Sequence, residues 1–159
     1  LRISIPDAFV RNLQGEQISI EQVRVLKEEG NQFFRKGDLK DAQRRYNTAL
    51  GMLEELRELN LEVMKLRQLL NLNLALISIK FHDYQRAVRL CKETVGSTWG
   101  SAKAFYRLGC AYIGLEDYEE AKESFYKALK YEPGNATVAE KIRQLEKDKF
   151  DYNTLKMYR

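Results

Sequence analysis

The stretch that decides the fold runs from Ala102 to Pro133 and reads AKAFYRLGCAYIGLEDYEEAKESFYKALKYEP. Its pattern predicts two helices joined by a tight turn, with Gly109 in the first helix and Ala121 and Ala128 in the second. Small residues at these three positions let the two helices approach each other closely. Large rings fill the space beside them, from Phe105, Tyr112 and Phe125.

The same arrangement of small and large residues recurs upstream. Ala75 lies 34 positions before Gly109 (109 − 75 = 34), and Gly30 lies 45 positions before Ala75 (75 − 30 = 45). The longer spacing exceeds the shorter by 11 residues (45 − 34), which is about three helical turns. Because residues 50–80 contain no helix breaker except Gly51, we expect the extra residues to lengthen the helices.

This pattern resembles the tetratricopeptide repeat, a helix–turn–helix unit with a period of about 34 residues. The resemblance implies an all-α fold, a right-handed superhelical stack of three tetratricopeptide repeats over residues 19–135. It further implies a C-terminal capping helix and tail over 136–159. Residues 1–18 lack a helical period and are predicted to form an N-terminal arm or linker, with a strand expected only near Leu1–Ile5.

Seven helices are expected, and the first has a clear start. Ser19 is predicted as its N-cap, and Gln22 three residues later completes a capping box. The second helix should bury Ala42, Tyr46, Ala49, Leu50 and Leu53, and the leucine-rich third helix should be packed on both sides. The expected ranges are 20–36, 39–58, 61–81, 84–94, the two helices of the opening stretch, and a helix from Ala136 that carries Val138, Ile142 and Leu145.

The composition is ordinary for a soluble helical domain, with 159 residues, 44% hydrophobic and 31% charged. No apolar run approaches the roughly 18 residues of a membrane span, and no signal peptide is visible. Because the chain begins at Leu1 rather than Met, we expect an excised fragment of a longer, cytoplasmic protein.

The two cysteines and the few other special side chains suggest no metal or cofactor. Cys91 and Cys110 are expected to be small, buried, reduced residues, because no zinc-ligand spacing is present and the single histidine, His82, falls in a turn. Trp99, in the loop over 95–100, is predicted to be a packed anchor.

Polar side chains interrupt the helices that should line the groove. In a stack of helix pairs, the first helix of each pair faces the concave side. Lys27 and Asn31 are four residues apart on one such helix, Lys103 and Arg107 are four apart on another, and Asn73 lies in an apolar stretch between them. Lysine supplies a point charge, arginine a planar fork and asparagine an amide donor, so the set is suited to carboxylates.

These five residues match, type for type, the two-carboxylate clamp of tetratricopeptide co-chaperones, and the resemblance covers about residues 20–145. In that family the groove binds the C-terminal Glu-Glu-Val-Asp of heat-shock protein 90 and heat-shock protein 70. The resemblance therefore implies a co-chaperone module whose site is Lys27, Asn31, Asn73, Lys103 and Arg107. Phe34, one turn beyond Asn31, is a candidate contact for an apolar side chain of the peptide, with ordinary packing between repeats as the alternative.

The lengthened helices and the seventh helix resemble the C-terminal domain of FKBP-type immunophilins. The phrase NQFFRKGDLKDAQRRYNTAL (31–50) is similar to the germline branch, the Shutdown-like proteins of the piRNA pathway. On this reading any prolyl-isomerase domain lies outside the fragment, and the fragment itself is not an enzyme.

Other functions remain as alternatives. No Ser-His-Asp set or Gly-rich phosphate loop supports catalysis. The net charge of +4 and pI of about 9.0 would allow weak RNA binding, but acids intersperse the cations, so no nucleic-acid partner is expected. An assembly scaffold or homodimer is a further alternative to the expected monomer. The last helix could also bind calmodulin or another acidic partner through Lys141, Arg143, Lys147 and Lys149.

Overall fold

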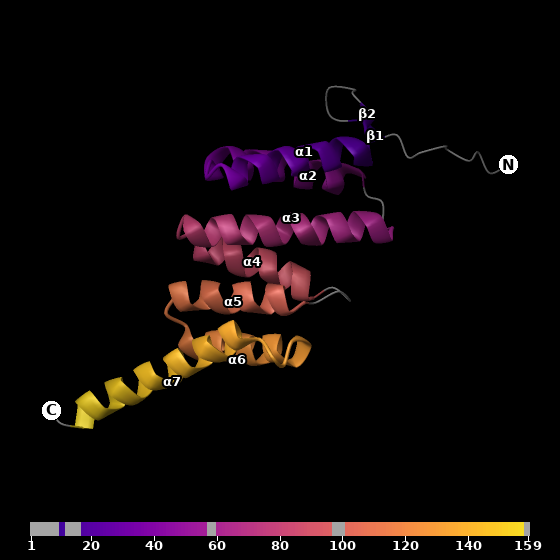
Figure 1. Cartoon of the computed structure of the whole chain (residues 1–159). Helices are drawn as coiled ribbons and strands as arrows, with labels where there is room; N and C mark the ends of the chain where they lie inside the picture. Colours follow the sequence, from indigo (N-terminus) through magenta and orange to yellow (C-terminus); the bar gives the residue numbers. More distant parts are fainter. Residues whose placement is uncertain (1–9, 12–16, 57–59, 97–100, 158–159) are drawn as a thin grey trace. The chain divides into compact units, whose positions relative to one another are not determined.

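The computed structural model describes residues 10–11, 17–56, 60–96 and 101–157 (Figure 1). It confirms the all-α class and the expected seven helices in this part of the chain. Two very short strands precede them, β1 (Val10–Arg11) and β2 (Gln17–Ile18). The helices are α1 (Ile20–Arg35), α2 (Leu39–Leu56), α3 (Leu61–Lys80), α4 (Tyr84–Val95), α5 (Ala102–Gly114), α6 (Tyr118–Tyr131) and α7 (Ala136–Met157).

The expectation that no strand would form outside Leu1–Ile5 was wrong. β1 and β2 pair antiparallel, with Val10 opposite Ile18 and Arg11 opposite Gln17. Ile18 is buried, so the pairing accompanies the burial of an apolar side chain. The extended piece predicted near Leu1–Ile5 lies outside the described residues.

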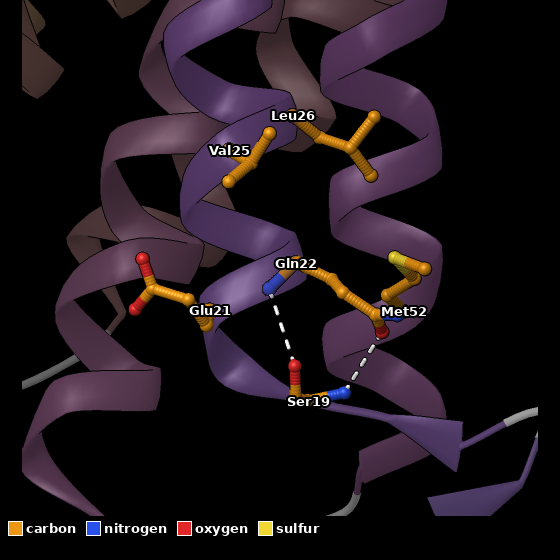
Figure 2. Close-up of a pocket in the computed structure, with 6 residues that line it drawn as sticks. All are labelled: Ser19, Glu21, Gln22, Val25, Leu26 and Met52. Atoms are coloured by element: carbon orange, nitrogen blue, oxygen red, sulfur yellow. Dashed lines mark hydrogen bonds between the residues drawn. The ribbon is translucent and has the colours of Figure 1, made fainter.

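The predicted capping box at the start of α1 is confirmed. The Ser19 hydroxyl accepts a hydrogen bond from the Gln22 backbone N–H at 3.3 Å, and the Ser19 N–H donates to Oε1 of Gln22 at 3.0 Å (Figure 2). These two bonds satisfy the backbone N–H groups of Ser19 and Gln22, which have no partner within the helix. They thereby fix the residue at which α1 begins.

The chain divides into two compact units, Leu1–Ile77 and Ser78–Arg159, and each is described by itself. In both units two helices pack closely, because a glycine of one helix lies against an aromatic ring of the other. A Cβ built on Gly30 of α1 would lie 2.6 Å from Cε1 of Tyr46 in α2, and one on Gly109 of α5 would lie 2.5 Å from Cε1 of Phe125 in α6. The small residues predicted at the crossings are fully buried as expected, among them Ala42, Ala49, Ala75, Ala87, Ala121 and Ala128.

The turn that follows the first helix of a pair has the same geometry three times. Gly37, His82 and Glu116 all have positive φ, at 82°, 61° and 59°. After each, the next N–H reaches back five residues, as Asp117 N–H does to the Tyr112 carbonyl at 2.9 Å. This is the Schellman arrangement, which ends a helix sharply and satisfies its last carbonyls. Its spacing repeats the 45 and 34 residues of the sequence pattern (82 − 37 and 116 − 82).

Helix α3 is less completely buried than its composition suggested. Leu70, Leu72 and Leu74 are buried, but Leu69 is 46% exposed. A helix of apolar residues still turns some of them outward, because only those facing a neighbouring helix can be covered. Leu50 of α2 and Leu76 of α3, also expected in the core, are half-buried.

Helix α7 begins at Ala136 as predicted and continues to Met157, so the segment expected to be a polar tail is helical up to that residue. Val138 and Ile142 are buried, and Leu145 is half-buried. Figure 1 shows α7 lying against α6 at its start and extending beyond it. Among the described residues, no helix is long and apolar enough to cross a membrane.

The glycine contacts give a test of the helix register. Gly109→Ala should place a methyl group against the Phe125 ring and destabilise the chain by roughly 1–3 kcal/mol through overpacking. Gly51→Ala is the matched control, because a Cβ on Gly51 in α2 meets nothing within 4 Å. There alanine should stabilise the helix by about 0.5–1 kcal/mol. Thermal unfolding of the two variants should shift in opposite directions, and a shift in the same direction would contradict the packing described.

Candidate functional site

Helix α1 places Lys27 and Asn31 one turn apart, on either side of the contact between Gly30 and Tyr46. Both side chains are half-buried. The hydroxyl of Tyr46, a residue only 2% exposed, donates a hydrogen bond of 2.6 Å to Oδ1 of Asn31. Because this bond occupies the amide oxygen, it fixes which end of the Asn31 side chain carries the donors.

Asn73 of α3 lies near the same hydroxyl. Burial raises the pKa of Tyr46, and the nearby Arg35 charge opposes that rise, with a smaller lowering from Asn73. Tyr46 therefore bonds to Asn31 of α1 and lies near Asn73 of α3. All three residues belong to the Leu1–Ile77 unit.

Glu28 completes the network on the solvent side. Its carboxylate accepts hydrogen bonds from Nδ2 of Asn31 at 3.3 Å and from Nη2 of Arg35 at 3.1 Å. These two bonds lower the pKa of the exposed Glu28 side chain, and the charge of Lys27 adds a smaller lowering. The Asn31 amide nitrogen has two hydrogens, so one N–H beyond that used by Glu28 is left for a ligand.

Lys27 also lines a hollow between α1 and Leu66 of α3, about 390 Å³ in volume. An ion pair between Arg24 and Glu62 joins the same two helices. The exposed Val25 is shared with a second, largely apolar hollow at the start of α1, shown in Figure 2. That hollow is lined by Ser19, Glu21, Gln22, Val25, Leu26 and Met52.

Lys103 and Arg107 lie on α5, in the Ser78–Arg159 unit. Lys103 is exposed, whereas Arg107 is half-buried beside Cys91 and Cys110. Burial lowers the pKa of Arg107, and the nearby cysteines oppose that shift. An arginine stays charged under all ordinary conditions, so Arg107 supplies a fixed positive charge that is partly shielded from solvent.

The structure thus brings together part of the predicted set. Asn31 bonds to Tyr46 and Asn73 lies near that residue, with Lys27 one turn from Asn31, while Lys103 and Arg107 share one helix of the other unit. That all five face one groove stays a prediction, and so does the role of Phe34, which is half-buried on α1. Trp99, predicted as a loop anchor, lies outside the described residues.

Tyr46 is the residue that sequence reasoning placed only in the core. The sequence did indicate a polar partner for Tyr46, because a buried tyrosine, unlike phenylalanine, needs a partner for its hydroxyl. Two asparagines without an assigned partner lay in neighbouring helices of the same predicted stack.

Comparison with known proteins agrees with this geometry. The family model for the tetratricopeptide repeat matches residues 102–135, the stretch that defines α5 and α6. The chain is a tetratricopeptide-repeat (TPR) domain. It resembles the C-terminal TPR domain of FKBP-type co-chaperones.

Three similar proteins illustrate the resemblance. FK506-binding protein 59 of Drosophila melanogaster is 29% identical over 123 residues, which are 77% of this chain and 28% of that protein. The C-terminal TPR-containing domain of a Plasmodium falciparum FK506-binding protein is 27% identical, with a TM-score of 0.76 over 85% of this chain and 93% of that one. The second TPR domain of human RPAP3, solved with the HSP70 peptide SGPTIEEVD, is 26% identical, with a TM-score of 0.66 over 79% and 96%.

The TPR domain spans little more than a quarter of the length of the curated relatives it matches. Most of the length of those relatives therefore has no counterpart in this chain.

The two cysteines of the TPR domain provide a test of burial. Burial raises the pKa of Cys91 to about 12, and raises that of the half-buried Cys110. We expect Cys91 to resist iodoacetamide at pH 8, because the thiolate is the reactive form, and to react once guanidinium unfolds the chain. Peptide mass spectrometry after timed alkylation measures this, and rapid labelling of native Cys91 would contradict its placement.

The same shift predicts a pH dependence. The folded chain keeps the Cys91 proton between about pH 9 and pH 12, where the unfolded chain releases it. The folded state then binds more protons, so the free energy of unfolding should fall as the pH rises through that range. Cys91→Ala should reduce this slope in denaturant titrations at several alkaline pH values.

Proposed function

We propose that this TPR domain is a chaperone-binding module that holds a peptide ending in Glu-Glu-Val-Asp through a two-carboxylate clamp. The clamp residues are Lys27, Asn31, Asn73, Lys103 and Arg107, and the partner is the C-terminal tail of heat-shock protein 90 or heat-shock protein 70. The free terminal carboxylate is an essential part of the ligand.

The observation that carries the proposal is the polar group around Tyr46. Asn31 is held at the Tyr46 hydroxyl, Asn73 lies near it, and Lys27 stands one turn from Asn31 with its side chain partly exposed. Amide donors beside an ammonium group form charge-assisted hydrogen bonds to a carboxylate, which are stronger than neutral ones. A site for an anion explains why such side chains stand on helices that otherwise bury apolar residues.

The relatives support the same partner. The RPAP3 domain similar to this chain was solved with a heat-shock peptide that ends in Glu-Glu-Val-Asp. The resemblance to FKBP-type proteins supports a role as the interaction domain of a longer protein whose isomerase activity lies elsewhere.

In the proposed complex, Lys27, Asn31 and Asn73 hold the terminal carboxylate and the Asp side chain. Lys103 and Arg107 hold oxygens nearer the middle of the peptide, and Phe34 contacts an apolar side chain. A short peptide loses much conformational freedom on binding, so we expect a micromolar dissociation constant, about −8 kcal/mol.

The finer parts of the proposal concern context. We assign the three repeats to residues 19–135, the arm to 1–18 and the capping segment to 136–159, and we place the protein in the cytoplasm as a monomer. Membership of the germline Shutdown-like branch, and with it the piRNA pathway, rests on the resemblance of residues 31–50 only.

Calorimetry with paired peptides tests the proposal. A peptide ending in Glu-Glu-Val-Asp should bind as the free acid and lose most of its affinity as the C-terminal amide, because amidation removes one of the two carboxylates. Lys103→Ala or Arg107→Ala should weaken binding about tenfold, equivalent to about 1.4 kcal/mol, with little change in thermal stability. Added salt should weaken the complex, since the attraction is between partly exposed charges.

Lys130→Ala is the matched control, because Lys130 is an exposed lysine in the last turn of α6 and its loss changes the net charge equally. It should leave the affinity unchanged. Equal binding of the acid and amide peptides, or no binding of either at millimolar concentration, would contradict the clamp.

A further inference from the structure

The hydrogen bonds around Tyr46 have a single direction. The Tyr46 hydroxyl donates to Oδ1 of Asn31, and Nδ2 of Asn31 donates to Glu28. Each side chain in this chain of bonds therefore has a fixed donor and acceptor end. Reversing one amide would set oxygen against oxygen or leave a half-buried group without its bond, which is costly.

The ring of Tyr46 cannot move away from this position. It is 2% exposed and lies against Gly30, where a Cβ would approach its Cε1 atom to 2.6 Å. Gly30 directly precedes Asn31 in α1, so the same contact fixes the ring and the backbone that carries the amide. The hydroxyl is thereby held at one point against α1.

We propose that Tyr46 is the positioning residue of the carboxylate site, which orients the amide of Asn31 before any ligand arrives. This inference rests on the proposed function for its ligand, but the orientation of the amide is a property of the free chain. Tyr46 does not touch the peptide. It acts by removing the rotational freedom that the Asn31 side chain would otherwise lose on binding.

Tyr46→Phe tests the proposal, because it keeps the packed ring and removes the hydroxyl. We expect about three- to tenfold weaker binding of the free-acid peptide, the effect of one net hydrogen bond. The salt dependence of binding should not change, because no charge is lost. Tyr112→Phe is the matched control: Tyr112 is also buried, at 8% exposure, but its ring lies beside Lys92 in the other unit, and its affinity should equal that of the wild-type chain.

A double-mutant cycle separates positioning from general damage. If Tyr46 acts through Asn31, then Tyr46→Phe should cost less affinity in the Asn31→Ala chain than in the wild-type chain. Full additivity of the two substitutions, or unchanged affinity in Tyr46→Phe, would overturn the proposal.

The mobility of the Asn31 side-chain amide can be measured in the wild-type chain, so this test does not depend on the folding of a variant. The side-chain amide group of Asn31 should be as ordered in nitrogen-15 relaxation as the helix backbone, before any peptide is added. In Tyr46→Phe the same signals should show added motion. A mobile Asn31 amide in the free wild-type chain would overturn the positioning role even if the peptide binds, whereas an ordered amide without peptide binding would uphold it and count against the proposed function only.

Discussion

The contact between a glycine on one helix and an aromatic ring on the next is the constraint on which both units depend. At Gly30 and Tyr46, and at Gly109 and Phe125, the space for a Cβ atom is already filled by the ring. Close packing of this kind allows the helix axes to approach and buries the ring almost completely. It also fixes the rotation of each helix about its own axis, and so decides which side chains are left to face outward.

The candidate site follows from that rotation. Because Gly30 must face Tyr46, the residue after it and the residue a turn before it point to adjoining parts of the surface, and these are Asn31 and Lys27. The ring that completes the apolar packing ends in a hydroxyl, and this hydroxyl donates to the amide oxygen of Asn31. Packing and ligand recognition therefore share one side chain in the first unit, whereas in the second unit the equivalent ring, Phe125, has no polar end.

Much of this was predictable from the sequence, since the repeat spacing carries both the helix order and the packed positions. The start of α1 followed from the Ser19 capping box, a local interaction between residues three apart. The pair of short strands before α1 and the helical continuation of α7 to Met157 were missed, because neither short strands nor a polar helix end shows a strong periodic signal. The bond between Tyr46 and Asn31 was missed because it joins two helices, and such contacts are set by tertiary geometry.

The three turns that join the two helices of each pair differ in the conformational cost of their backbone. Gly37 adopts its positive φ at no steric cost, but His82 and Glu116 adopt nearly the same conformation with side chains, which disfavours each by about 1–2 kcal/mol. The ring of His82 stacks on Tyr84 at 5.6 Å and recovers part of this cost, whereas Glu116 is exposed. The third turn therefore keeps an uncompensated conformational cost at Glu116, far in sequence from the polar residues of α1. An engineered chain in which this cost is removed would have a larger free energy of unfolding. It could therefore tolerate destabilising changes in its binding face.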